Sequence, residues 1–276
     1  MAAVQPQAPE STVAPLLDIR GVEVTYEKVE LAIRGINVSV PEGSVTVVLG
    51  ANGAGKTTLL RAIGGFLPGD HAVVSDGQIQ YRGKRIDGMA PHKVTKLGIV
   101  TIPEKDKIFP GMTVEENLRV SSSGTGDGEI RETLNELFPV LERRRKDVAG
   151  YLSGGERQML SIASALLCDP QVMMVDELSL GLAPKLVEEL FELVRRIAAE
   201  RGLTVLMVEQ DARAALAIAD QAYVLESGRI VLHGTAERLL EHEDVREFYL
   251  GIGEGEEETR SYADVKQYTR TRRWWG

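Results

Sequence analysis

The stretch Gly50-Ala51-Asn52-Gly53-Ala54-Gly55-Lys56-Thr57 decides the fold, because it fits the pattern G-x-x-x-x-G-K-[ST]. Residues 45–49 before it form a continuous apolar run that is typical of a buried parallel strand. Residues 57–66 after it are compatible with a helix that Gly and Pro terminate. Glycines allow backbone N–H groups to surround phosphate oxygens, and a helix N-terminus attracts the same anion. The sequence therefore predicts a phosphate-binding loop, and hence a nucleotide site.

The residue types in this loop suit a nucleoside triphosphate. We expect Lys56 to bridge the β- and γ-phosphates and the hydroxyl of Thr57 to bind Mg²⁺. The predicted nucleotide-binding residues of the loop are Gly50, Ala51, Asn52, Gly53, Ala54, Gly55, Lys56, Thr57 and Thr58. The alternative is a Gly-rich turn with an incidental lysine, which the flanking strand and helix argue against. The loop alone does not distinguish a kinase from a GTPase or an ATPase.

A second apolar run, residues 172–175, ends in the carboxylate pair Asp176 and Glu177. Ligands in parallel sheets bind where the strands end, so this pair is predicted to lie beside the phosphates. We expect Asp176 to hold Mg²⁺ through water and Glu177 to act as the general base toward the attacking water. Strand-ending acidic pairs are also common on surfaces, but the phosphate loop favours the catalytic interpretation.

The segment Leu152-Ser153-Gly154-Gly155-Glu156-Arg157-Gln158 precedes a helix-compatible run. Ser153 and the N–H groups of Gly154 and Gly155 can form a second anion site at a helix start. One chain already has a complete phosphate cradle, so a second is useful if it caps the γ-phosphate of ATP held by another copy. An ordinary serine N-cap is the alternative.

Taken together, residues 50–58, 152–158 and 172–177 resemble the Walker A, signature and Walker B motifs of ABC transporter ATPases. The resemblance covers about residues 16–250. It implies an α/β fold with a RecA-like P-loop NTPase core, an antiparallel β lobe and an inserted helical lobe at about 105–168. It also implies ATP hydrolysis at a head-to-tail dimer interface. Tyr26 matches the aromatic residue that stacks on adenine, with a simple strand aromatic as the alternative.

Finer matches resemble the Liv-type ATPases of branched-chain amino acid uptake, and especially the LivF-like member. They are Pro103-Glu104, Ile108-Phe109-Pro110, residues 113–118, residues 179–184 and Val208-Glu209-Gln210. In this resemblance Glu104 faces the metal where many ABC ATPases have Gln. Gln210 replaces the usual switch histidine, and its amide can donate to the γ-phosphate without carrying a proton's charge.

Two positions depart from the superfamily pattern without being typical of the Liv group. Leu178 stands where Pro usually follows the catalytic glutamate, and Ser164 replaces a common Arg of the signature helix. Either change is expected to loosen the local geometry, which puts the efficiency of coupling in question.

Composition bounds the location and the partners. The chain has 276 residues and a net charge of −9, which disfavours nucleic acid as a partner. It contains no apolar run near the roughly 20 residues of a spanning helix. We expect a disordered leader at 1–15, the ATPase domain at 16–250 and a charged, aromatic tail at 251–276. The tail is either a membrane- or partner-docking segment or a solvated extension.

The resemblance implies the ATP-binding subunit of an ABC importer on the cytoplasmic face of the membrane. Its implied partners are a second ATPase (a homodimer or a LivG-like heterodimer), separate transmembrane permease subunits and a periplasmic or extracellular substrate-binding protein. Branched-chain amino acids are the expected cargo. The alternatives are the ATPase of a urea/amide or lipid transporter, or a soluble non-transport ABC ATPase.

Overall fold

The computed structural model describes residues 14–104, 108–121, 126–242 and Val245. The whole predicted tail and all but two residues of the predicted leader lie outside these ranges. Within them, no helix combines the length and apolarity needed to cross a bilayer. The predicted domain boundaries stay predictions.

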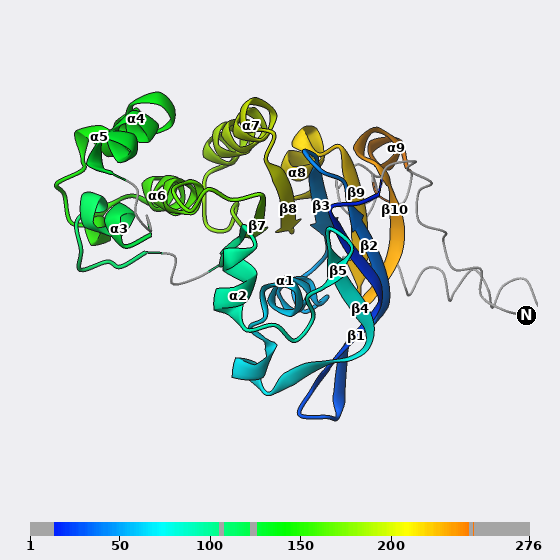
Figure 1. Cartoon of the computed structure of the whole chain (residues 1–276). Coiled ribbons are helices and arrows are strands. Elements are labelled where there is room, and N and C mark those ends of the chain that lie inside the picture. Colours follow the sequence, from blue (N-terminus) through cyan, green and yellow to red (C-terminus); the bar gives the residue numbers. More distant parts are fainter. Residues whose placement is uncertain (1–13, 105–107, 122–125, 243–244, 246–276) are drawn as a thin grey trace, which may run out of the picture.

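A six-stranded sheet forms the centre of the molecule (Figure 1). Its strand order is β10-β9-β3-β8-β7-β6. The strands are β3 (Val45–Leu49), β6 (Ile99–Ile102), β7 (Val172–Asp176), β8 (Thr204–Glu209), β9 (Gln221–Glu226) and β10 (Arg229–Thr235). Five of them are parallel, and the edge strand β10 pairs antiparallel with β9. Every residue of β3, β7 and β8 is buried, and for β3 and β7 this confirms the buried strands that the apolar runs predicted.

A second, antiparallel sheet has the order β2-β1-β4-β5. It comprises β1 (Leu17–Tyr26), β2 (Glu30–Val40), β4 (Ala72–Tyr81) and β5 (Lys84–Arg85). Apolar side chains of this sheet, of helix α1 (Lys56–Gly64) and of one face of the central sheet form a shared core. Within β4, Gly77 has a φ of 79°, and a register shift of the β1–β4 pairing falls beside it.

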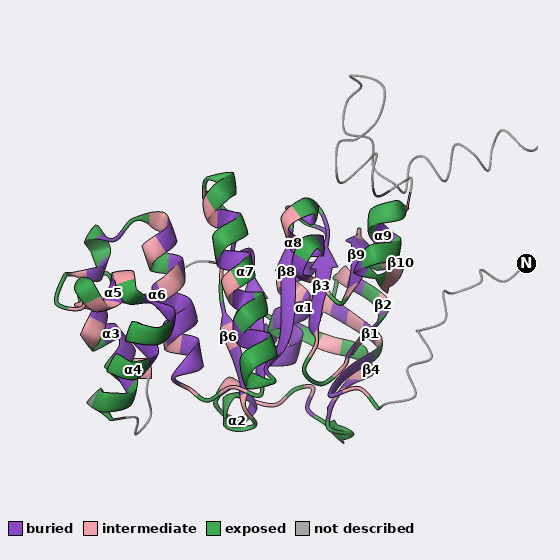
Figure 2. Ribbon diagram, turned by 90° about the horizontal axis from the view of Figure 1, so that it is seen from above, coloured by how far each residue is buried: buried purple, intermediate pink, exposed green. Residues whose placement is uncertain are grey.

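The opposite face of the central sheet packs on helices, and the strand alternation explains how. Met173 and Val175 of β7 face the core that the helices cover, whereas Val172 and Met174 face the core shared with the antiparallel sheet. Figure 2 shows buried residues concentrated in the strands and on the inner sides of the helices. Helices on this side are α7 (Pro184–Arg201), α8 (Ala212–Ile218) and α9 (Ala236–Glu241). Pro184 occupies the first turn of α7, and Gly202 ends it in a left-handed conformation.

The chain between β6 and β7 is largely helical and lies at one end of the molecule (Figure 1). Its helices are α3 (Val114–Ser121), α4 (Asp127–Leu137), α5 (Pro139–Arg143) and α6 (Gly154–Leu166). Helix α6 contacts both α3 and the sheet strand β6, and so joins the helical end to the core. The helix α2 (Pro91–Lys96) precedes β6. Two sheets with helices in this arrangement confirm the predicted α/β fold class with its antiparallel and helical parts.

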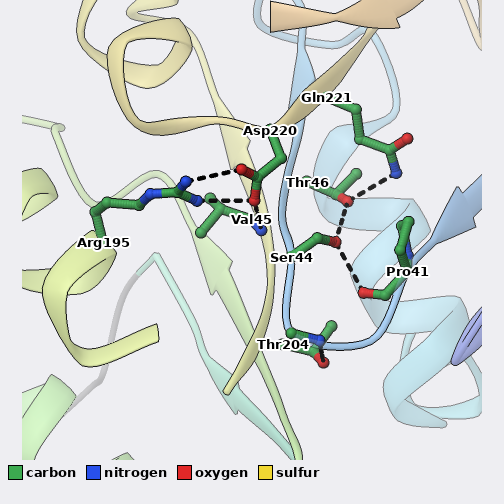
Figure 3. Close-up of polar contacts among 9 residues, drawn as sticks. Pro41, Ser44, Val45, Thr46, Arg195, Thr204, Asp220 and Gln221 are labelled. Carbon is green, nitrogen blue, oxygen red and sulfur yellow. Dashed lines mark hydrogen bonds and ion pairs between the residues drawn. The ribbon is translucent and has the colours of Figure 1, made fainter. Parts of the chain in front are cut away.

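Polar contacts tie the start of β3 to its neighbours (Figure 3). Asp220 accepts two hydrogen bonds from the Arg195 guanidinium of α7, at 2.7 and 2.8 Å, and one from the Val45 N–H at 2.8 Å. The buried Thr46 hydroxyl accepts from the Gln221 amide at 3.0 Å. Burial alone would raise the pKa of Asp220, but the hydrogen bonds from Arg195 and Val45 outweigh it and lower the pKa.

We predict that Asp220→Asn lowers the free energy of unfolding by about 1–2 kcal/mol at pH 7, because it removes a charge-assisted, partly exposed pair. The stabilisation that comes from a lowered folded-state pKa is complete above the ordinary carboxyl pKa of about 3.9. It is lost as the pH falls through the folded-state pKa. In urea unfolding between pH 7 and 3, the difference in the free energy of unfolding between the native chain and Asp220→Asn should become smaller below about pH 4. The exposed pair Glu42–Arg82 offers the control Glu42→Gln, and equal effects of the two variants would contradict the prediction.

Candidate functional site

The predicted phosphate-binding loop joins β3 to α1, and two of its glycines, Gly50 and Gly55, are required by a close approach and by the backbone conformation. A Cβ on Gly50 would lie 2.4 Å from the Leu225 carbonyl oxygen, so no larger residue fits. Gly55 has a φ of 110° and directly precedes the first helical residue, Lys56. The loop therefore turns tightly into the positive end of α1, which suits an anion.

Lys56 is almost completely buried, and its ammonium meets three oxygens. Its Nζ donates to the carbonyls of Gly50 at 2.7 Å and Ala51 at 2.9 Å. It also lies 3.1 Å from Oε1 of Glu177 in an ion pair that is largely shielded from water. The residues predicted to bind phosphate and to activate water are thus in direct contact, although they lie 121 positions apart.

The three predicted metal ligands lie on one side of the loop. Thr57 Oγ1 donates to Asp176 Oδ1 at 3.2 Å. Burial raises the pKa of Asp176, and the nearby carboxylates of Glu177 and Glu104 raise it further. In the described ranges, no three His, Cys, Asp or Glu residues cluster as a metal cage. One hydroxyl and two carboxylates fit Mg²⁺, which is usually held by few protein ligands together with substrate phosphates.

An open cavity of about 550 Å³ lies over the loop, a volume typical of small-ligand sites. It is lined by Tyr26, Glu30, Ala32, Asn52, Gly53, Gly55, Lys56, Thr57, Thr58, Glu104, Glu177 and Leu180. Tyr26 ends β1, and its hydroxyl lies 3.1 Å from Thr58 Oγ1, which brings the antiparallel sheet to the mouth of the cavity. Glu30 is a lining residue that the sequence did not indicate, since it lies in an unremarkable strand.

Ser153, Gly154 and Gly155 do not line this cavity. Exposed Ser153 is the N-cap of α6, and its Oγ accepts from the N–H of Glu156 at 3.3 Å. The Glu156 carboxylate accepts in return from the Ser153 N–H at 2.8 Å, which completes a capping box. A Cβ on Gly155 would lie 2.3 Å from Leu186 Cδ2, so this glycine allows α6 to approach α7.

Arg144 supports this cap and was not predicted from the sequence, where it is one of several adjacent basic residues. Its guanidinium donates to Glu156 at 2.7 Å, to Asp147 at 2.8 Å and to the Tyr151 carbonyl at 3.3 Å. Burial acts to raise the pKa of Glu156, but the Ser153 and Arg144 donors outweigh it and lower the pKa. The glutamate is therefore held ionised at the start of α6.

The remaining predicted positions are Gln210 and the two residues that depart from the superfamily pattern, Leu178 and Ser164. Gln210 is exposed, does not line the cavity, and follows the buried residue Glu209 at the end of β8. Leu178 is fully buried in the core, and Ser164 is half-buried on α6. Their effect on coupling stays a prediction. The sequence assigned no role to Glu209, although it stands in the match Val208-Glu209-Gln210 and closes an apolar strand.

We predict that Arg144→Ala destabilises the start of α6, because Glu156 loses a charged donor. Hydrogen exchange of amides in residues 153–158 should quicken, with a matching fall in urea stability. Arg145→Ala is the matched control, since Arg145 pairs with Glu142 only at 3.9 Å. Unchanged exchange in Arg144→Ala would contradict the structural role given to this arginine.

Comparison with known proteins agrees with this geometry. The profile of the family described as "ABC transporter" matches residues 33–179. The chain is 39% identical to the high-affinity branched-chain amino acid transport ATP-binding protein BraG of Pseudomonas aeruginosa, covering 86% of this chain and 100% of the relative. It is 40% identical to the probable branched-chain amino acid transport ATP-binding protein LivF of Archaeoglobus fulgidus, covering 79% and 91%.

Among solved structures, an ATP-binding cassette of an ABC transporter in its ADP conformation superposes with a TM-score of 0.74. It is 28% identical and covers 86% of this chain and 98% of that chain. A nucleotide-free cassette, also 28% identical, gives a TM-score of 0.70 over 87% and 99%. The phosphate loop, the fold and the relatives all indicate the same family, so the family predicted from the sequence is confirmed. The chain belongs to the ABC transporter family, as an ATP-binding subunit that hydrolyses ATP.

Proposed function

We propose that this subunit drives an importer of branched-chain amino acids. The observation that carries the proposal is the 39–40% identity to BraG and LivF over nearly their whole lengths. Both names specify branched-chain amino acid transport. A urea/amide or lipid transporter and a soluble non-transport ATPase are the alternatives, and the names of these relatives do not favour them.

For catalysis, the loop 50–58 holds the triphosphate of ATP, with Lys56 on the β- and γ-phosphates and Tyr26 stacked on adenine. Glu177 takes a proton from the attacking water, and Gln210 donates to the γ-phosphate. Thr57, Asp176 and Glu104 would hold Mg²⁺, which neutralises phosphate charge when bound. The 3.1 Å contact between Lys56 and Glu177 supports these roles, because the proposed base and the proposed phosphate-binding cation are neighbours.

For assembly, Ser153, Gly154 and Gly155 close over ATP that is bound to a second ATPase subunit. Ser153 is exposed, Gly154 is half-buried, and all three residues lie outside the chain's own cavity, which supports this arrangement. Pseudomonas aeruginosa has BraF beside BraG, and Archaeoglobus fulgidus has LivG beside LivF, among the relatives of this chain. A LivG-like companion is therefore favoured over a second copy.

The complete transporter needs further subunits. Separate permease subunits cross the membrane, and a periplasmic or extracellular binding protein selects the cargo. This chain lies peripherally on the cytoplasmic face, where ATP is supplied. Nucleic acid is not a partner, in keeping with the net charge of −9.

We predict that Glu177→Gln lowers kcat for ATP hydrolysis by about 10²- to 10⁴-fold, because a general base is lost while the phosphate loop is intact. ATP affinity should change little, whereas Lys56→Ala should weaken it strongly. Glu189→Gln, an exposed change on α7, is the matched control. Full turnover by Glu177→Gln in the presence of Mg²⁺ would refute the assignment of the base.

The cargo is tested with the companion ATPase, permease and binding protein of the same organism in proteoliposomes. We predict ATP-dependent uptake of radiolabelled leucine that Glu177→Gln abolishes. Uptake of urea or an amide without leucine would overturn the cargo and leave the ATPase assignment standing. Hydrolysis that no permease stimulates would overturn the transport role itself.

A further inference from the structure

One fully buried carboxylate lies near Glu177, where the strands of the central sheet end. The proposed reaction does not use it. Glu209, the last residue of β8, has no exposed surface. Burial raises the pKa of its carboxyl, and several hydrogen-bond donors oppose this shift. A buried acid is retained in a fold only where such donors compensate for the lost water. Its contacts therefore show which parts of the chain it holds.

The donors come from two loops that belong to different strands. The Ser179 hydroxyl donates to Glu209 Oε2 at 2.6 Å, and the Ser179 N–H donates to Oε1 at 3.1 Å. The Gln210 N–H lies 3.3 Å from Oε2. The carboxylate thus joins the loop that follows Glu177 to the loop that begins with Gln210.

The backbone N–H of Leu178 acts to lower the pKa of the same carboxyl. Proline, the usual residue of the superfamily at this position, has no N–H and would not have this effect. The Leu178 side chain is completely buried in the core, between Glu177 and the Ser179 that binds Glu209. The departure from the superfamily pattern therefore adds apolar burial to this loop.

Glu177 needs such anchors because its backbone is in the left-handed region, with a φ of 45°. Its own N–H donates to the Val208 carbonyl at 3.0 Å, and Ser179 donates two hydrogen bonds to Glu209. Glu177 and Ser179 are thus both bonded to the end of β8. In this position the Glu177 side chain reaches Lys56.

We propose that Glu209 is a positioning residue that clamps residues 177–179 and Gln210 together, and so aims the catalytic base at the γ-phosphate. This inference rests on the proposed roles of Glu177 and Gln210. A carboxylate suits the position because it only accepts, and every group around it donates. A glutamine of the same shape would turn an NH₂ donor toward another donor.

The test is ATP hydrolysis by Glu209→Gln, with the companion ATPase present and well below the melting temperature. We expect kcat to fall about 10- to 100-fold with little change in KM for ATP, because a small displacement of a reacting group is costly. Ser179→Ala, a milder change, should lower kcat less, and Ser179→Thr should restore it. The double variant Glu209→Gln/Ser179→Ala should lose less than the sum of the single changes.

Thr204→Val is the matched control at the other end of β8. Thr204 is equally buried, and its hydroxyl accepts from the Gly43 N–H at 2.9 Å. This variant should lose stability and keep its kcat. A native kcat in both Glu209→Gln and Ser179→Ala would overturn the proposal. So would a fall in kcat that Thr204→Val reproduces, because it would reflect general destabilisation.

The unmodified chain and Glu177→Gln are measured in the same assay to separate this inference from the proposed function. If the native chain hydrolyses ATP, Glu177→Gln does not and Glu209→Gln is normal, the positioning role alone fails. If Glu177→Gln is fully active, the catalytic assignment fails, and the positioning role fails with it. Hydrogen exchange of residues 177–182 gives a second readout, and slow exchange in Glu209→Gln would count against the clamp.

Discussion

The parallel pairing of β3, β8 and β7 is the constraint on which the site depends. Its register sets Leu49 opposite Glu209, and Val208 opposite Asp176, so the three strands end at one edge of the sheet. The Gly50 N–H donates to the Glu209 carbonyl at 3.2 Å, which extends the pairing into the phosphate loop. A slip of one residue would turn each side chain of the displaced strand to the other face and separate Lys56 from Glu177.

The sequence predicted the parts of this edge that are local in the chain. The loop 50–58, the helix that follows it and the pair Asp176-Glu177 at the end of an apolar strand are encoded by short patterns, and they appear where the patterns placed them. Contacts between distant segments had no such pattern. The Lys56–Glu177 ion pair, the Arg144 support of the α6 cap and the Glu209 contacts arise from strand register and helix packing, which single-sequence periodicity does not contain.

Leu178 shows how a departure from a motif changes meaning once its surroundings are known. In the sequence, the loss of proline suggested a looser loop, since proline restricts the backbone. In the structure, the leucine side chain is completely buried in the core, and its N–H acts to lower the pKa of the Glu209 carboxyl. The stiffness of a proline ring is thereby replaced by apolar burial and by the two hydrogen bonds that the next residue, Ser179, donates to Glu209.

The hydrogen-bonding capacity of its hydroxyl explains how Ser153 can both cap α6 and bind a phosphate in the proposed assembly. In the capping box its oxygen accepts the Glu156 N–H, which uses a lone pair and leaves the hydroxyl hydrogen available. That hydrogen can be donated to a phosphate oxygen of another subunit while the α6 cap persists. Arg144 keeps the Glu156 carboxylate ionised and in place, so the cap does not depend on a bound nucleotide. The surface that we propose to meet ATP is therefore already formed in the single subunit, which reduces the conformational entropy lost on the proposed closure.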